Sequence, residues 1–480
     1  MAYKHGVYTY EVPTRLVAPV NGTAGLQVIF GTAPVNMASN PYDCTNKPMI
    51  CYDYAECVKN IGFSYDWKNY TLCQSVYACF KVKNIAPIIL VNVLDPKKHI
   101  KDMEANELAV IDSQAIIEQE GVLLDKLVLK DGENVLTADV DYTLEFTTEG
   151  YVLITVLTSA VTIKATGKVL APEMVTPMDI VGGYDVAKGI ETGMETIRQI
   201  YPLFGITPGL LLAPGWSHNA VVATTLQAKC EGINDLFTCE CICDVDSTSI
   251  GATKYTDVKK AKEDGGLNSI HCLPIWPKAK VGDLEFWGSA IAGALTAYTD
   301  AQNDDVPNLS PSNKAAGITA TCIDGGEEII LDQSRANLLN SQGVTTFINK
   351  GGYNLWGGRT AAYPNNTDPK DMWFNCRRFF SWRRNSFILT FSQMVDRNAD
   401  PRLIQTICDT ENIIGNGYVA RGYCAGDRIE FDMNENSATD ILNGTIRFHE
   451  YLAPYTPAHE ISNTFEFDVD TLMSNLAGGE

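Results

Sequence analysis

Hydrophobic and polar positions follow two kinds of periodic pattern along the chain. Between residues 25 and 93, short apolar runs alternate with segments in which apolar residues recur at helical spacing, which is typical of an α/β layer. Residues 96–172 change to segments of strict alternation, which predict a small β-rich insertion. The first pattern then resumes with the apolar run 209–213, so two segments of one core flank the insertion. The alternating segments are 127–129, 142–146, 152–156 and 161–165.

In the last third of the chain, the pattern of apolar residues predicts helices joined by short strands. Apolar spacing indicates helices over 333–339, 371–395 and 401–414. The chain ends in two β-prone runs, 445–452 and 460–469, which a proline-containing segment separates. The whole pattern therefore predicts a mixed α/β (α+β) fold with several domains.

Both ends of the chain carry a β-prone run without an evident local partner. Residues 6–12 form one, and a loop-like segment follows where a hairpin partner would normally lie. Residues 461–468 form the other. We expect these extended terminal β-strand arms to pair with other subunits; the alternative is an ordinary edge strand within the same subunit. The residues assigned to the arms are Gly6, Val7, Tyr8, Tyr10, Val12, Ile461, Phe465 and Phe467.

The composition is that of a folded, acidic protein. Of 480 residues, 45% are hydrophobic and 20% are charged, and this length predicts about three domains. The net charge of −21 argues against direct nucleic-acid binding, because phosphate neutralisation needs a concentrated basic face. No apolar run approaches the roughly 20 residues that cross a bilayer, and the N-terminus lacks the pattern of a secretion signal. We therefore expect no membrane insertion and synthesis in the cytoplasm.

Fourteen cysteines are spread along the chain without a repeated spacing. Three of them, Cys239, Cys241 and Cys243, alternate within a predicted buried strand over 236–245, so their thiols share one face. A zinc site needs a fourth ligand and usually a pair of cysteines two residues apart, and neither is evident. We therefore expect reduced thiols, no metal site and no cofactor.

Candidate catalytic motifs fail on their spacing. Residues 182–189 are glycine-rich but lack the spacing and the metal-binding hydroxyl of a phosphate loop. Residues 215–219 follow a predicted strand, as a nucleophile elbow does, yet Asn219 stands where the strained turn requires glycine. We predict no catalytic residue. The alternative from a different class is a cytoplasmic α/β enzyme that uses the turn after Leu212 as its active site.

Several different short motifs follow one another over most of the chain. They are His5-Gly6-Val7 with Glu11, Gly31-Thr32-Ala33-Pro34, Ser310-Pro311-Ser312-Asn313, Asn340 with Gly343-Val344, Trp356-Gly357-Gly358-Arg359-Thr360, Trp373 with Arg377-Arg378, and Tyr455-Thr456-Pro457-Ala458-His459-Glu460-Ile461. Their order and spacing resemble those of contractile tail sheath proteins from myovirus-type phages and R-type bacteriocins.

The resemblance implies a structural subunit and no enzyme. Sheaths of this family are stacked six-membered rings around an inner tube, and their contraction drives the tube through a target cell envelope without consuming nucleotide. The implied partners are the chain itself as a helical homopolymer, the inner tail tube protein, and the baseplate and tail terminator proteins. The implied location is a virion tail or bacteriocin particle that is assembled in the host bacterial cytoplasm. A sheath from a non-phage contractile injection system is a further alternative.

The resemblance also implies a domain order. It comprises an N-terminal arm (1–24), an α/β sheath domain in two segments (25–95 and 173–332), an inserted β-rich outer domain (96–172), a C-terminal core domain that faces the tube (333–455) and a C-terminal arm (456–480).

A basic segment interrupts the acidic chain at residues 373–402, which hold six arginines against two aspartates. These arginines either pair with carboxylates of the same or adjacent subunits, or some of them face an acidic stripe on the inner tube. The second interpretation rests on the resemblance, because family sheaths hold the tube in their extended state. The candidate tube contacts are Arg377, Arg378, Arg383 and Arg384.

Overall fold

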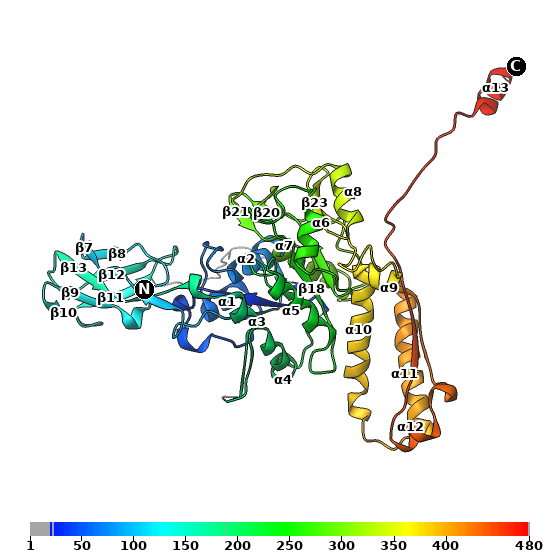
Figure 1. Cartoon of the computed structure of the whole chain (residues 1–480), viewed down its shortest axis with the longest axis horizontal. Helices are drawn as coiled ribbons and strands as arrows, with labels where there is room; N and C mark the ends of the chain where they lie inside the picture. The colour runs from blue at the N-terminus through cyan, green and yellow to red at the C-terminus, as the bar shows by residue number, and fades with distance from the viewer. Residues whose placement is uncertain (1–19, 22–23, 188, 479–480) are drawn as a thin grey trace, which may run out of the picture.

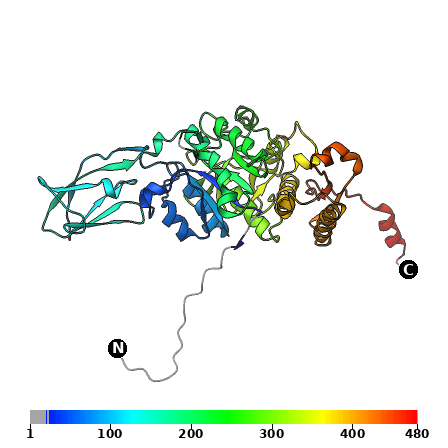
Figure 2. The ribbon, with the colours of Figure 1, turned by 90° about the horizontal axis from the view of Figure 1, so that it is seen from below.

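The computed structural model describes residues 20–21, 24–187 and 189–478. Figure 1 shows an elongated molecule with a β-rich lobe at one end, an α/β body in the middle and a pair of long helices at the other end. The view from below shows the same order, and the C-terminal tail leaves the molecule on the side of the long helices (Figure 2). The mixed α/β architecture predicted from the sequence is confirmed.

A six-stranded sheet forms the centre of the body. Its strands, in spatial order, are β19 (Cys272–Ile275), β18 (Glu240–Asp244), β17 (Leu210–Leu212), β2 (Gln27–Gly31), β5 (Ile88–Asn92) and β3 (Met49–Cys51). The first five run parallel, and β3 pairs antiparallel at one edge. Every residue of β2, β5, β17 and β18 is buried, as strands between two helix layers require.

Helices cover both faces of this sheet. They include α1 (Tyr54–Ile61), α2 (Leu72–Tyr77), α5 (Ala220–Glu231), α6 (Val258–Asp264) and α7 (Gly288–Ala301). Helix α7 lies so close to the face carrying Leu212 that a Cβ on Gly293 would stand 2.6 Å from the Leu212 Cδ1 atom. Helix α5 covers the opposite face, where the thiols of Cys230 and Cys241 meet. Glycine at position 293 therefore permits the close approach of helix and sheet.

The β-rich lobe has an apolar core of its own. Its strands are β6 (Ile100–Asp102), β7 (Asn106–Ala109), β8 (Gln114–Ile117), β9 (Val128–Asp131), β10 (Asn134–Val135), β11 (Tyr142–Phe146), β12 (Val152–Val156), β13 (Thr162–Thr166) and β14 (Lys168–Leu170). They form sheets in the orders β10-β9-β13-β7, β11-β12-β8 and β14-β6. The inward side chains of Ile117, Leu129 and Ile154 are fully buried, so the alternation read from the sequence separates a core face from a solvent face.

Residues 333–454 add five α-helices and two antiparallel pairs of strands to the body. The elements are α8 (Gln333–Ser341), β23 (Thr346–Asn349), β24 (Tyr353–Trp356), α9 (Pro369–Met372), α10 (Phe374–Phe391), α11 (Pro401–Ala420), β25 (Cys424–Glu430), α12 (Ala438–Leu442) and β26 (His449–Pro454). The predicted helix 371–395 is divided between α9 and α10. Helix α11 runs six residues beyond the predicted end at 414, because Gly415 lets it pack against β25: a Cβ there would stand 2.5 Å from the Asp427 carbonyl oxygen.

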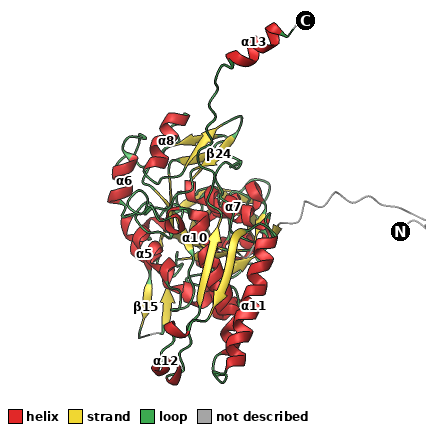
Figure 3. Cartoon of the chain, turned by 90° about the vertical axis from the view of Figure 1, so that its right-hand side faces the viewer, coloured by secondary structure: helices red, strands yellow, loops and turns green. Residues whose placement is uncertain are grey.

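The chain ends in an extended tail and a short helix, α13 (Val469–Ala477), which stand clear of the body (Figure 3). The predicted run 460–469 contains no strand. None of the described helices combines the length and the apolar character that spanning a bilayer requires.

Candidate functional site

The predicted C-terminal arm carries large apolar side chains that are exposed to solvent in the described chain. Ile461, Phe465 and Phe467 are 88%, 91% and 75% exposed. Ser462, Thr464 and Glu466 alternate with them, so an extended conformation puts the apolar side chains on one face. Burying each of them would be worth about 1.5–3 kcal/mol. Gly6, Val7, Tyr8, Tyr10 and Val12 of the predicted N-terminal arm lie outside the described residues.

Helix α13 follows the arm and was not predicted from the sequence. Asp468 begins it, because its carboxylate accepts a hydrogen bond from the Thr471 backbone N–H at 2.9 Å. The apolar residues Val469, Leu472, Met473 and Leu476 recur at helical spacing and are all exposed. The N-cap and this spacing were signals in the sequence for a helix directly after the predicted β-prone run, and the sequence analysis made no prediction there.

In the hairpin of β25 and β26, Asn412 of α11 bonds both backbone groups of Ile429 on the outer edge of β25, at 3.0 Å each, while no described residue adds a strand to β26 on its outer side. The hairpin is a two-stranded sheet in which Arg428 stands opposite Tyr451 and Glu430 opposite His449. Within the described residues, neither strand has a second neighbour. The outer edge of β26 is therefore the one that presents backbone N–H and C=O groups to a further strand.

Two of the four candidate tube contacts form buried ion pairs near the start of α10. Arg377 lies 3.1 Å from Asp371. Arg378 donates to both carboxylate oxygens of Asp300 on α7, at 2.9 Å to Oδ1, and both side chains are almost fully buried. Both arginines therefore join α10 to neighbouring elements of the same chain.

Arg383 contacts more carboxylates than any of the other three candidate arginines. Its guanidinium binds Glu411 of α11, lies 2.9 Å from Asp427 of β25 and donates to Glu450 of β26 at 2.9 Å. One cation thus joins α10 to three other elements, with 1% of its side chain exposed. Burial, with the two nearby carboxylates, raises the pKa of Glu450 to about 7, so this group holds a proton for much of the time at neutral pH. Arg384, the fourth candidate, has an exposed side chain.

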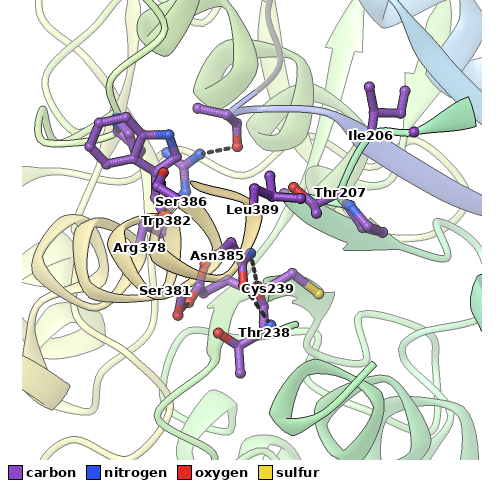
Figure 4. A pocket seen from close by; sticks show the side chains of 16 residues that line it. Ile206, Thr207, Thr238, Cys239, Arg378, Ser381, Trp382, Asn385, Ser386 and Leu389 are labelled. Carbon is purple, nitrogen blue, oxygen red and sulfur yellow. Dashed lines mark hydrogen bonds between the residues drawn. The ribbon is translucent and has the colours of Figure 1, made fainter. Parts of the chain in front are cut away.

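Polar contacts also fix α10 against the amino end of β18. Asn385 accepts from the Thr238 backbone N–H at 3.0 Å and donates to the Thr238 carbonyl at 2.7 Å. The Ser381 hydroxyl donates to Glu240 at 2.6 Å. These residues line a groove of about 310 Å³ beside the helix (Figure 4). Helix α10 is therefore a rigid support for α11 and the hairpin.

The turn after Leu212 does not assemble a nucleophile and a base. The Ser217 hydroxyl is buried and donates to Asp244 at 2.8 Å. The imidazole of His218 stacks on Trp287 with ring centres 4.5 Å apart. Among the described contacts of Ser217, none is to a histidine, so the enzyme alternative gains no support from this geometry.

A further cysteine lies beside the cysteines of the predicted strand 236–245. The Sγ atoms of Cys241, Cys243 and Cys272 lie within 4.8 Å of one another, because Cys272 on β19 stands beside Cys241 in the parallel register. The sequence reading missed Cys272, which lies 31 residues away along the chain from Cys241. Burial raises the pKa of the Cys241 thiol well above its usual value, which favours the protonated form.

The described elements place the chain among multi-domain α/β proteins with a β-rich insertion. No family model matches the chain. It is similar over its full length to structures from extracellular injection machines. For the baseplate of the anti-feeding prophage, the TM-score is 0.58 at 12% identity, with 98% of this chain and 100% of that chain covered. For the PVC sheath complex in the contracted state, the TM-score is 0.57 at 14% identity, with 98% and 99% covered. These matches confirm the predicted multi-domain sheath fold.

The sequence of the chain is similar to those of curated phage and prophage proteins. The chain is 27% identical to the tail sheath protein of Burkholderia phage BcepMu over 502 aligned residues, which cover 99% of both chains. It is 26% identical to a putative prophage major tail sheath protein of Pseudomonas aeruginosa over 58% of this chain and 69% of that one. The predicted resemblance to contractile tail sheath proteins is confirmed.

Proposed function

We propose that this chain is the repeating subunit of a contractile tail sheath, which polymerises as stacked hexameric rings around an inner tube and drives that tube through a target cell envelope. The observation that carries the proposal is the full-length similarity to a phage tail sheath protein. The relatives support a structural role and offer no support for the enzyme alternative.

The open edge of β26 supplies a mechanism for polymerisation. Backbone groups on the outer edge of β26 can accept a terminal arm of a neighbouring subunit as an additional strand, whereas Asn412 occupies the edge of β25 at Ile429. The exposed face of Ile461, Phe465 and Phe467 would then be buried in the neighbour. The buried ion pairs of Arg383 hold the receiving hairpin to α10, so that a strand added by a neighbour is attached to the subunit body.

The domain order extends this proposal. The lobe of residues 96–172 would be the outer domain, because it lies at the opposite end of the molecule from α10 and α11 (Figure 1). The segments 25–95 and 173–332 would form the sheath domain, 333–455 the core domain facing the tube, and 1–24 and 456–480 the arms. The baseplate, the tube and the tail terminator would be the partners of the assembled sheath.

Electron microscopy of the full-length chain tests the proposal. We expect the purified protein to form tubes or stacked rings with six subunits per layer, seen by negative staining and by sedimentation as large polymers. An enzyme of the alternative class would sediment as a small closed oligomer. A homogeneous small oligomer under all solution conditions would contradict the proposal.

Arg384 is the candidate tube contact that the geometry leaves available, since its side chain is exposed while those of Arg377, Arg378 and Arg383 are buried in pairs. Arg384→Glu should give sheaths that polymerise in the contracted form without holding the tube, because exposed pairs of about 0–1 kcal/mol each are repeated along the lattice. The matched control is Lys164→Glu, a charge reversal on the β-rich lobe. Sheaths of Arg384→Glu that assemble extended and contract normally would place the tube contact elsewhere.

A further inference from the structure

The buried cluster that joins the hairpin to α10 holds more negative than positive groups. Three carboxylates, of Glu411, Asp427 and Glu450, contact the single guanidinium of Arg383. The side chains of Glu411 and Asp427 are 2% and 1% exposed, whereas that of Glu450 is 20% exposed. A buried charge is costly unless it is paired, and one cation is shared here among three acids. The charge count therefore favours a proton on one of the three.

Contacts between the carboxyl groups indicate where this proton lies. The carboxyl groups of Glu450 and Asp427 hydrogen-bond to each other. Ionised carboxylates only accept hydrogen bonds, so one member of this pair carries the proton and donates it. Asp427 Oδ1 is buried and has no N–H or hydroxyl partner among the described residues, and a protonated Glu450 would supply a donor there. Glu450 is the more exposed of the two, so its carboxyl group can exchange the proton with water.

Two further titratable groups border the cluster, and neither changes its charge near neutral pH. They are Tyr418 on α11 and Cys424 on β25, and burial raises the pKa of both, so they stay neutral. Arg421, whose guanidinium lies 5.7 Å from the ring centre of Tyr418, stays cationic. The neighbours on β26, His449 and Tyr451, lie on the opposite face of the strand, because side chains alternate along it. A change in charge inside the cluster therefore falls on the carboxyl pair.

We propose that the proton shared by Glu450 and Asp427 makes the attachment of the hairpin to α10 depend on pH. Without this proton, three negative charges surround one guanidinium, and Glu450 is the most exposed of the three acids and can move toward water. Glu450 lies on β26, so its movement loosens the strand whose outer edge would receive the arm of a neighbour. This last consequence rests on the proposed function.

The direction of the effect follows from the pKa of Glu450 in the attached and the detached hairpin. Burial, with repulsion by Asp427 and Glu411, outweighs the attraction of Arg383 and raises this pKa from 4.5 to about 7. The detached hairpin thus loses the proton near pH 4.5 and the attached one near pH 7. Attachment therefore weakens as the pH rises between these two values, and above them this group adds no further change. From pH 6 to pH 8, the equilibrium constant for attachment should fall about tenfold.

Hydrogen exchange of dispersed full-length subunits, measured by mass spectrometry at pH 6 and pH 8, tests the proposal. After correction for intrinsic exchange rates, peptides of β25 and β26 should be about tenfold less protected at pH 8, with the central sheet as the internal reference. Glu450→Gln places a neutral amide of the same size in the cluster and should abolish this pH dependence. The matched control is Glu430→Gln, which removes a carboxylate paired with Arg428 on the same hairpin and should retain it.

Equal protection of the wild-type hairpin at pH 6 and pH 8 would overturn the proposal, and this result requires no variant to fold. A pH dependence that Glu450→Gln retains, or that Glu430→Gln also removes, would overturn it as well. The measurement uses dispersed subunits, so each of these results leaves the sheath function untouched. Failure of the chain to build tubes would, in turn, leave the exchange result unchanged.

Discussion

We expect removal of residues 461–480 to leave a folded subunit that cannot build sheath tubes. The segment keeps Ile461, Phe465 and Phe467 exposed in the single chain, so its loss should change the free energy of unfolding by less than about 0.5 kcal/mol. In the polymer the same side chains would be buried in a neighbour, at about 1.5–3 kcal/mol each and once per subunit. Thermal melting measures the first effect, and negative-stain microscopy with sedimentation measures the second.

Substitutions on the two faces of the arm make this result specific. Phe465→Ser with Phe467→Ser should prevent tube formation as the deletion does, because the apolar face is lost. Ser462→Ala with Thr464→Ala changes the opposite face and should leave tube formation intact. Removal of residues 1–12 tests the N-terminal arm in the same assay. Normal tubes from an arm deletion would show that this arm does not connect subunits.

Arg383→Met should cost about 3–5 kcal/mol of stability in the part of the chain that carries the hairpin, because it leaves buried carboxylates without their cation. Glu411 and Asp427 are 2% and 1% exposed, so neither has water to replace the guanidinium. We expect a lower melting temperature and faster amide hydrogen exchange in β25 and β26 than in the central sheet.

The adjacent arginine provides the control for this experiment. Arg384→Met removes a guanidinium of the same size from the next position of α10, where the side chain is exposed, and should change stability by less than about 0.5 kcal/mol. Adding Glu411→Gln to Arg383→Met should recover part of the loss, since one buried negative charge is removed. Equal melting temperatures for Arg383→Met and Arg384→Met would contradict the role assigned to the buried cluster.

Relatives explain why so much of the function was readable from the sequence. The resemblance to sheath proteins was carried by the order of short motifs such as Trp356-Gly357-Gly358-Arg359-Thr360, and a resemblance of this kind needs no three-dimensional information. The carboxylate cluster around Arg383 had no such signal. Its members Glu411, Asp427 and Glu450 come from three different elements, and only the tertiary structure puts them around one guanidinium.

Local patterns determined the architecture. A fully apolar run predicted β17, strict alternation predicted β11 and β12, and helical spacing predicted α10, because periodicity and propensity act between residues close in sequence. The tertiary structure alone decided what the charged and terminal residues do. Arg378 meets Asp300 across 78 positions and Arg383 meets Glu450 across 67, so their burial could not be read from a locally basic segment. The terminal run 461–468 was β-prone by composition, yet a strand needs a neighbour for its backbone hydrogen bonds, and a single chain provides none there.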